Sequence, residues 1–508
     1  MEDSRIKKTS INIISAFLLQ FVKIALVFIS RIIFVRILGA SYLGVNGLFS
    51  NILGILSLAD LGMATALMYC LYEPLAKNDE LTIKKYMNYF KKVYNFIAIA
   101  VAIVGVSLLP FLKYLVNLPT DMPNIYLYYI LLLLNSVISY LFVYKTTLIS
   151  ADQKMYLINK YDTIFQFILF FLQTVILLIT KSFTFYLVVN IICSFICNIL
   201  KVKKTEEVYP FLKSKEKAEL DNNEKKSIFK NLSSLFFYKL GSIIQNNTDN
   251  ILISIFVGTI TVGYYSNYTT IIAAITTFLT LIFTSLKASI GNYNVKESKE
   301  NQLKLFNIFE VYNFWIVGFC TICFIILIPD FIRICFGEEY VLSFGLLICV
   351  SLNFYTSNIR QVIWSYRETT GIFNKTKYIT IITALINIVL SLILGQFYGL
   401  IGIVGATVIA RLMYAWWREP QILFGCYFKS SPKSYYISYI KRIVLCTIMI
   451  VVISLVCNLV NISNIYINFI VKGIICCILS AVIFYIIYCK SEAMRYLKNN
   501  ILRKLKGA

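Results

Sequence analysis

The chain has 508 residues, of which 59% are hydrophobic and 14% are charged, and its formal net charge is +23. Soluble domains carry about 25% charged residues, so this composition excludes a soluble globular protein and indicates a polytopic membrane protein. In a membrane protein an excess of lysine and arginine orients the loops, so this charge is no sign of nucleic-acid binding.

Long apolar segments recur through the whole chain. The first of them, 11–38, is too long for the core of a signal peptide and lacks a cleavage pattern, so we expect it to be retained as a span. We predict an all-α membrane protein with about fourteen transmembrane helices: Ile11–Leu38, Val45–Leu71, Tyr89–Leu112, Ile125–Ile149, Ile164–Thr180, Phe183–Leu200, Leu232–Val257, Val262–Leu286, Phe306–Pro329, Val341–Ile363, Tyr378–Phe397, Leu400–Trp417, Ile443–Val460 and Ile465–Cys489.

The distribution of basic residues predicts the orientation. Only Lys113, Lys181 and Arg333 fall in the odd-numbered loops, while the termini and even-numbered loops are rich in lysine and arginine. Basic loops stay in the cytoplasm, so we expect a multi-pass protein of the cytoplasmic membrane with both termini inside. The outer loops are short, as at Gln396–Gly399, which leaves no room for an external catalytic domain.

An internal repeat is visible in the sequence. ILGASYLG (Ile37–Gly44) ends the first span and FVGTITVG (Phe256–Gly263) ends the seventh, at a displacement of 219 residues. Farther on, Ser150–Lys154 after the fourth span corresponds to Thr370–Lys375 after the tenth. Six spans separate each pair, so the two halves insert with the same orientation. This predicts two parallel-repeat lobes of six helices, followed by two C-terminal helices.

These repeats give the expected domain limits. The N-terminal lobe would cover 1–200 and the C-terminal lobe 232–424, with two extra spans and a cytoplasmic tail in 425–508. Between the lobes, 201–231 carries nine lysines and several acids and is predicted to be a solvated, partly helical cytoplasmic linker.

The seventh span is unusually polar. Within KLGSIIQNNTDNILISIFVG (Lys239–Gly258), six polar residues follow one another from Gln245 to Asn250. An ionisable group at bilayer depth costs about 2.5–3.5 kcal/mol on insertion scales, so it usually faces a bundle interior or a watery cavity. Hydrogen bonds between helices would use the same amides. At helical spacing, one stripe contains Ser234, Tyr238, Ser242, Gln245 and Asp249.

The first span offers a partner for this stripe. A displacement of 219 residues maps Asp249 and Asn250 onto Ser30 and Arg31, which share a helical face with Gln20 and Lys23. We expect the two helices to face each other across the gap between the lobes. The candidate substrate-binding residues are therefore Lys23, Arg31, Lys239 and Asn246.

Two carboxylates lie at similar depth in the predicted spans, Asp60 in the second and Asp249 in the seventh. They are candidates for ion coupling, or for a permanent ion pair with Arg31 that would explain the same residues. The chain has no histidine, and its cysteines are scattered through apolar segments as small core residues. We therefore expect no metal and no cofactor, apart from a possible coupling proton or sodium ion.

Several segments carry a resemblance to a known family: RILGASYLGVNGLFS, DNILISIFVGTITVGYYSNYTT, FGEEYVLS and TGIFNKTKYITIITALINIVLSLILGQFYGLIGIVGATVIARL. In these segments and in its span count the chain resembles the polysaccharide transporter, or oligosaccharide flippase, family of the multidrug/oligosaccharidyl-lipid/polysaccharide exporter superfamily. The resemblance implies two six-helix lobes in a V shape plus two extra helices. It also implies a non-enzymatic function, the transfer of a polyprenyl-pyrophosphate-linked oligosaccharide to the outer leaflet. Family members often carry a cationic central cavity, which Lys23, Arg31 and Lys239 could supply here.

The expected partners are thus the lipid-linked oligosaccharide, membrane lipids and other polysaccharide-assembly proteins. Two other functions compete. A multidrug exporter of the same superfamily would favour an acid-lined cavity over a cationic one. A membrane glycosyltransferase or glycan polymerase would need a sizeable outer loop or a DxD-type metal pair, and the sequence shows neither.

Overall fold

The structure, a computed structural model, describes the backbone of residues 2–60, 62–118, 122–214, 219–460 and 462–505. Within these ranges the side chains of 2–19, 59, 222–224, 226–238, 288–289, 295, 373–374 and 500–505 are not described. The described residues form helices joined by short turns and contain no strand, which confirms the predicted all-α fold. Contacts divide the chain into two compact units, Met1–Gly263 and Tyr264–Ala508.

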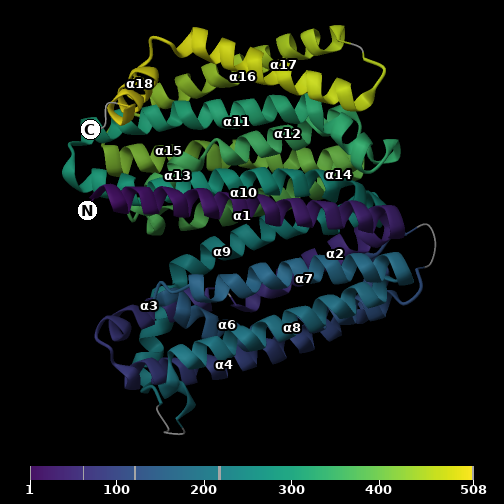
Figure 1. Ribbon diagram of the computed structural model, residues 1–508, viewed down its shortest axis with the longest axis vertical. Helices are drawn as coiled ribbons and strands as arrows, with labels where there is room; N and C mark the ends of the chain where they lie inside the picture. The colour runs from purple at the N-terminus through teal and green to yellow at the C-terminus, as the bar shows by residue number, and fades with distance from the viewer. Residues whose placement is uncertain (1, 61, 119–121, 215–218, 461, 506–508) are drawn as a thin grey trace. The chain divides into compact units, whose positions relative to one another are not determined.

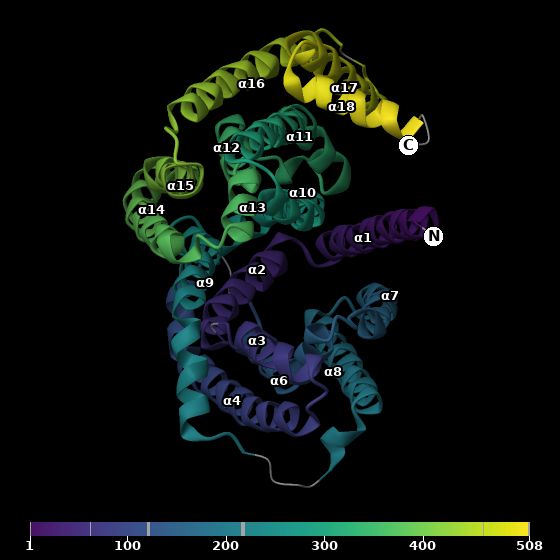
Figure 2. The same cartoon turned by 90° about the vertical axis from the view of Figure 1, so that its left-hand side faces the viewer.

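The first unit is a bundle of long helices joined by short connections (Figures 1 and 2). Short 3₁₀ turns at Ser57–Asp60, Leu109–Phe111 and Pro210–Lys213 separate some of the helices. The helices are α1 (Glu2–Leu38), α2 (Ala40–Leu56), α3 (Met63–Ala76), α4 (Glu80–Ser107), α5 (Leu112–Leu115), α6 (Ile125–Ala151), α7 (Tyr156–Thr180), α8 (Phe183–Val208) and α9 (Asn222–Phe256).

The second unit begins within α10 and continues to the C-terminus. A 3₁₀ turn at Glu338–Tyr340 and π-helical segments at Arg411–Ala415 and Phe424–Phe428 interrupt its regular helices. The helices are α10 (Thr259–Lys296), α11 (Lys299–Cys335), α12 (Phe344–Asn358), α13 (Gln361–Thr369), α14 (Phe373–Ala410), α15 (Trp416–Leu423), α16 (Lys433–Leu459), α17 (Ile465–Tyr488) and α18 (Glu492–Leu505).

Among the described residues, nine helical segments are long and apolar enough to cross a membrane. They contain ten of the predicted spans, because the segment Lys375–Phe428 covers both the eleventh and the twelfth. The remaining four, the first, second, seventh and tenth, lie on helices that are interrupted or carry charged and polar side chains. The polytopic membrane fold is therefore confirmed, and three of these four spans, the first, second and seventh, carry the predicted site residues.

The prediction of an unbroken second span is wrong. Helix α2 ends at Leu56, a 3₁₀ turn covers Ser57–Asp60, and α3 begins at Met63 after Gly62, whose φ is +94°. Glycine adopts a positive φ without steric cost, so it permits the break. As a consequence Asp60 lies at the interruption instead of on a continuous helical face.

The eleventh and twelfth predicted spans form a helical hairpin within α14. The chain reverses at Gly399, with φ 56° and ψ −131°, inside the predicted outer turn. The Asn387 side-chain amide donates to the Thr407 hydroxyl across the hairpin at 2.9 Å. A Cβ atom on Gly402 would overlap the carbonyl of Leu394, so the two arms approach closely just past the turn.

The internal repeat has a structural counterpart in the first unit. Gly39 and Gly258, which are 219 residues apart, both have positive φ and directly precede α2 and α10. A Cβ on Gly44 would overlap the carbonyl oxygen of Thr259, and a Cβ on Gly263 would overlap that of Ala40. Ala40 and Thr259 are themselves repeat equivalents, so the two glycine segments contact each other reciprocally.

Further hydrogen bonds hold this contact. The backbone N–H of Asn117 donates to the Thr259 hydroxyl at 2.9 Å, and the backbone N–H of Thr259 donates to the backbone carbonyl of Asn117 at 2.7 Å. Ser254 donates to the carbonyl of Leu115 at 2.6 Å. Three loops that the charge distribution assigns to the outside therefore meet at one end of the first unit.

Buried ion pairs fasten both C-terminal spans to α11 in the second unit (Figure 1). Arg442 of α16 donates to Glu310 of α11 at 3.0 Å, and Lys472 of α17 donates to Asp330 of α11 at 2.8 Å. All four side chains are largely shielded. Removing one partner would leave a buried charge uncompensated, so these pairs fix which helices α16 and α17 contact.

The predicted domain limits remain a prediction, because the compact units of the structure divide the chain on a different basis. Helix α9 packs along α2, and the boundary between the compact units comes after it at Gly263, whereas the sequence repeat starts a new half at α9. In the predicted linker 201–231, α8 continues to Val208 and α9 begins at Asn222.

Candidate functional site

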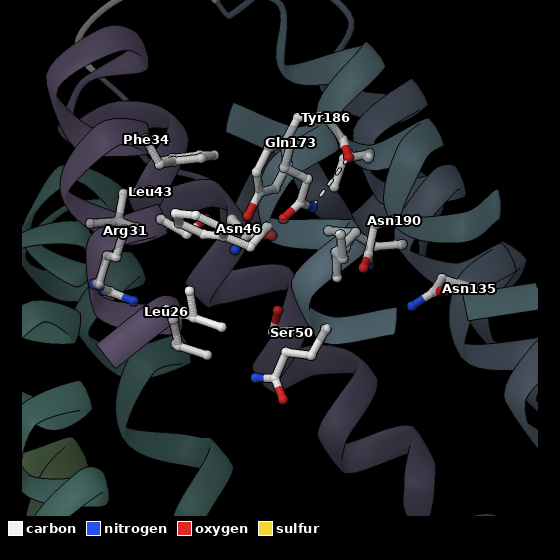
Figure 3. A pocket seen from close by; sticks show the side chains of 17 residues that line it. Leu26, Arg31, Phe34, Leu43, Asn46, Ser50, Asn135, Gln173, Tyr186 and Asn190 are labelled. Carbon is white, nitrogen blue, oxygen red and sulfur yellow. Dashed lines mark hydrogen bonds between the residues drawn. The ribbon is translucent and has the colours of Figure 1, made fainter. Parts of the chain in front are cut away.

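A cavity of about 400 Å³ lies inside the first unit among α1, α2, α6, α7 and α8 (Figure 3). Leucines and the ring of Phe34 form its apolar wall. All five helices contribute polar side chains, which are Ser30, Arg31, Asn46, Ser50, Asn135, Gln166, Gln173, Tyr186 and Asn190.

The polar side chains of α7 continue along one face of the helix. Asp162, Gln166 and Gln173 recur at helical spacing and line cavities. The opposite face carries exposed apolar side chains, with Phe171 65% and Leu178 62% exposed. A helix with these two faces presents the apolar one to lipid and keeps the polar one inside the bundle.

A second cavity of about 380 Å³ adjoins the first, and Asn135, Gln166 and Leu169 line both. It is bordered at one end by an ion pair between Asp162 of α7 and Lys201 of α8. On α8 the lining continues from one cavity into the other through Tyr186, Asn190, Ser194, Asn198 and Lys201. Tyr186 and Lys201 are about 22 Å apart at the helical rise. We name the two adjoining cavities the polar corridor.

Arg31 gives the first cavity its electrostatic character. No aspartate or glutamate is found among the described residues that line this cavity. Gln173 donates to the backbone carbonyl of Tyr186 at 3.5 Å, and the surrounding amides and hydroxyls are neutral (Figure 3). A guanidinium among neutral donors favours an anion, above all a phosphate, which it can contact with two parallel hydrogen bonds.

The structure does not gather the six predicted site residues in one place. Of these residues, Arg31 is the one that lines the polar corridor; the described linings of both cavities lack the others. Lys23 lies about two turns before it on α1. Asn246 is exposed and donates to Ser242 on its own helix at 3.3 Å. The side chains of Ser234 and Tyr238, which the predicted stripe includes, lie outside the described residues.

The predicted carboxylates occupy other surroundings. Asp60 accepts a hydrogen bond from Tyr94 at 2.9 Å and interacts electrostatically with Lys239. Asp249 is buried on α9 at 9% exposure. Within the described part of the chain, no three histidine, cysteine, aspartate or glutamate side chains lie where they could hold a metal ion.

The amides and hydroxyls of α6, α7 and α8 were not among the residues predicted from the sequence. Their signal is present in the sequence, because Gln166 and Gln173 on one helix and Asn190, Ser194 and Asn198 on the next recur at helical spacing inside apolar spans. Each amide alone fits a hydrogen bond between helices equally well. Only the shared cavity shows that these faces meet.

The comparisons with known proteins identify the fold. No protein-family model matches the sequence, and no curated protein sequence is similar to it. A structure of the lipid II flippase MurJ in an inward closed conformation has a TM-score of 0.69 and 15% identity, covering 94% of this chain and 99% of that one.

Two MATE transporters have the same fold. An inward-facing MATE family transporter of the MOP superfamily has a TM-score of 0.55 and 13% identity, covering 77% of this chain and 91% of that one. The Vibrio cholerae MATE transporter VcmN has a TM-score of 0.52 and 13% identity, covering 84% of this chain and 98% of that one. The chain is therefore an integral membrane protein with the fold of the MurJ and MATE transporters.

Proposed function

We propose that this protein is a flippase of the cytoplasmic membrane that moves a polyprenyl-pyrophosphate-linked oligosaccharide from the inner to the outer leaflet, for cell-surface polysaccharide assembly. The observation that carries the proposal is Arg31 in a polar cavity whose described lining contains no carboxylate, within a fold shared with a lipid II flippase. The protein is then a transporter, not an enzyme.

The anionic head group explains the cation. A pyrophosphate loses its hydration when it enters a bilayer, so its carrier must supply charge and hydrogen-bond donors in place of water. Arg31 supplies the charge, and the neutral donors around it, such as Gln173 and Asn190, complete the polar shell. The greasy polyprenyl tail needs no site of this kind because it stays in lipid.

The polar corridor suits the sugars of the same substrate. Amides donate and accept hydrogen bonds at once, as sugar hydroxyls do, and the middle of the corridor is lined by Asn135, Ser139, Gln166 and Ser194. Its only described charges are Arg31 at one end and the Asp162–Lys201 pair at the other. Each cavity has more than ten times the volume of one water molecule, about 30 Å³, so the space exceeds what a bare ion needs.

Coupling is a separate part of the proposal. Asp60 and Asp249 lie outside the described lining of the polar corridor, so either could bind a proton or sodium ion without competing with the anionic head group. Asp60 stands at the break between α2 and α3, where a change of charge would act on a discontinuous helix. We propose these two carboxylates as the coupling candidates.

Cells that lack the protein test this function. We expect them to assemble the lipid-linked oligosaccharide and to retain it in the cytoplasmic leaflet, where enzymes added outside cannot reach it. If the oligosaccharide is never assembled, the protein has an enzymatic role. If it is assembled and flipped normally while drug resistance falls, the protein is a multidrug exporter.

A further inference from the structure

The C-terminal helix α18 is held against α11 in the second unit. Tyr312 of α11 donates to the carbonyl of Ala493 at 2.8 Å, and Ala493 and Met494 are buried. Beyond this anchor, Tyr496 is 41% exposed. The start of α18 is therefore fixed to the membrane-embedded helices while part of its surface remains open.

A cavity of about 390 Å³ lies between α18 and the ends of α10 and α11. Leu305 and Ile308 form its apolar part, where α11 enters the predicted ninth span. Its other lining side chains are two cations, two amides, two phenols and one acid, which are Lys304, Arg495, Asn301, Asn499, Tyr293, Tyr496 and Glu492. The site is thus polar at one end and apolar at the other.

The charges around this cavity favour an anion. Arg495 forms no ion pair with any described residue, and Lys304 lies in the same cavity wall. Two acids oppose them, because Glu492 lines the cavity and Glu300 pairs with Lys304 at 2.8 Å. The sequence from 490 to 506 nevertheless holds six basic residues and one acidic residue, so the surroundings are strongly positive.

We infer that this cavity binds the head group of an anionic phospholipid of the inner leaflet, with the phosphate between Lys304 and Arg495. The amides and phenols donate to the remaining phosphate and glycerol oxygens, and Leu305 and Ile308 contact the start of the acyl chains. Basic pockets between membrane helices on the cytoplasmic side recognise anionic head groups in this way. The inference rests on the predicted cytoplasmic position of the C-terminus and is independent of the transported substrate.

Native mass spectrometry of the full-length protein from nanodiscs tests the site. The nanodiscs contain phosphatidylcholine with phosphatidylglycerol, and the spectrum reports which lipid stays bound. The wild type should retain phosphatidylglycerol in preference to phosphatidylcholine. Losing a direct hydrogen bond from a charged side chain to a phosphate lowers affinity about tenfold or more, so Lys304→Gln with Arg495→Gln should weaken retention by at least about tenfold.

The matched control is Lys490→Gln with Lys498→Gln, which removes the same charge from residues that do not line the cavity. Its retention of phosphatidylglycerol should equal that of the wild type. Equal losses in both double variants would show attraction by the basic surface without a site. Undiminished retention in the first variant, or equal retention of both lipids by the wild type, would also overturn the inference.

Discussion

Arg31 and Lys239 are both cations within predicted spans, yet their surroundings differ. Lys239 interacts with a carboxylate, Asp60, which lies at the break between α2 and α3. The described wall around Arg31 holds amides, hydroxyls and Tyr186 in place of acids. A guanidinium in a cavity lined by neutral polar side chains suits an anion, so we interpret Arg31 as a ligand-binding group and Lys239 as part of a polar cluster.

Substitution of Arg31 should therefore affect transport more than folding. Arg31→Gln should lower the transport rate about tenfold or more, because a hydrogen bond to a charged group contributes about 1.5–3 kcal/mol. Arg31→Lys should lie between this variant and the wild type, since it keeps the charge and loses the planar fork. The rates are measured in proteoliposomes with a fluorescent polyprenyl-pyrophosphate oligosaccharide.

Arg36→Gln is the matched control for this series, because Arg36 is exposed on the same helix and does not line the polar corridor. Its transport rate should match that of the wild type. Equal rates for Arg31→Gln and the wild type would reduce Arg31 to a structural residue.

The sequence could predict Arg31 because a charge within an apolar span has few explanations. It could not select Gln173 or Asn190, since single amides in spans are common and their meaning depends on which faces meet. Lys23 and Asn246 share helical faces with other candidates in sequence, but the structure places neither in the corridor lining. Helical periodicity predicts which residues share one face of a helix. It does not predict which other helix packs against that face.

Helices of this protein meet closely where glycines permit it. The reciprocal contact joins Gly44 to Thr259 and Gly263 to Ala40, with no space for a Cβ on either glycine. Gly47, one turn after Gly44, is different, because its Cβ would lie 3.4 Å from the Val262 side chain. The sequence repeat predicted that the two segments are equivalent, but it could not predict that they touch.

Gly44→Ala should loosen this contact. The added methyl group forces the Thr259 carbonyl away, so amide hydrogen exchange in 39–44 and in 258–263 should accelerate together. Gly47→Ala, whose methyl group has room, should leave both exchange rates unchanged. Unchanged exchange in Gly44→Ala would show that the backbone yields without separating the two segments.

At the scale of the whole molecule, hydropathy predicted most of the fold. Each predicted span falls mainly on helical residues, and the turn at Gly399 lies in a predicted outer loop. The breaks at Gly62 and before Gln361 were not predicted, because the apolar residues on the two sides of each break together have the length of one span. Hydrophobicity reports depth in the membrane, whereas these breaks depend on local backbone conformation and packing.

Two lysines that flank α8 test the orientation of the whole chain. Lys181 and Lys213 are both exposed, and the charge distribution assigns them to the outer and inner sides respectively. A membrane-impermeant maleimide added outside should label Lys181→Cys above the wild-type background and should leave Lys213→Cys unlabelled until the membrane is opened. Labelling of Lys213→Cys in intact cells would show that this residue lies outside, opposite to the predicted topology.

The central claim is that the protein moves a lipid-linked oligosaccharide between leaflets, and the most direct measurement uses the purified protein alone. Proteoliposomes carry the fluorescent polyprenyl-pyrophosphate oligosaccharide in both leaflets, and an enzyme that cleaves the glycan is added outside. With the protein present, nearly all of the substrate should become cleavable with time, whereas protein-free liposomes should expose only their outer leaflet. Cleavage that stops at the outer-leaflet fraction in both preparations, with and without a proton or sodium gradient, would contradict the claim.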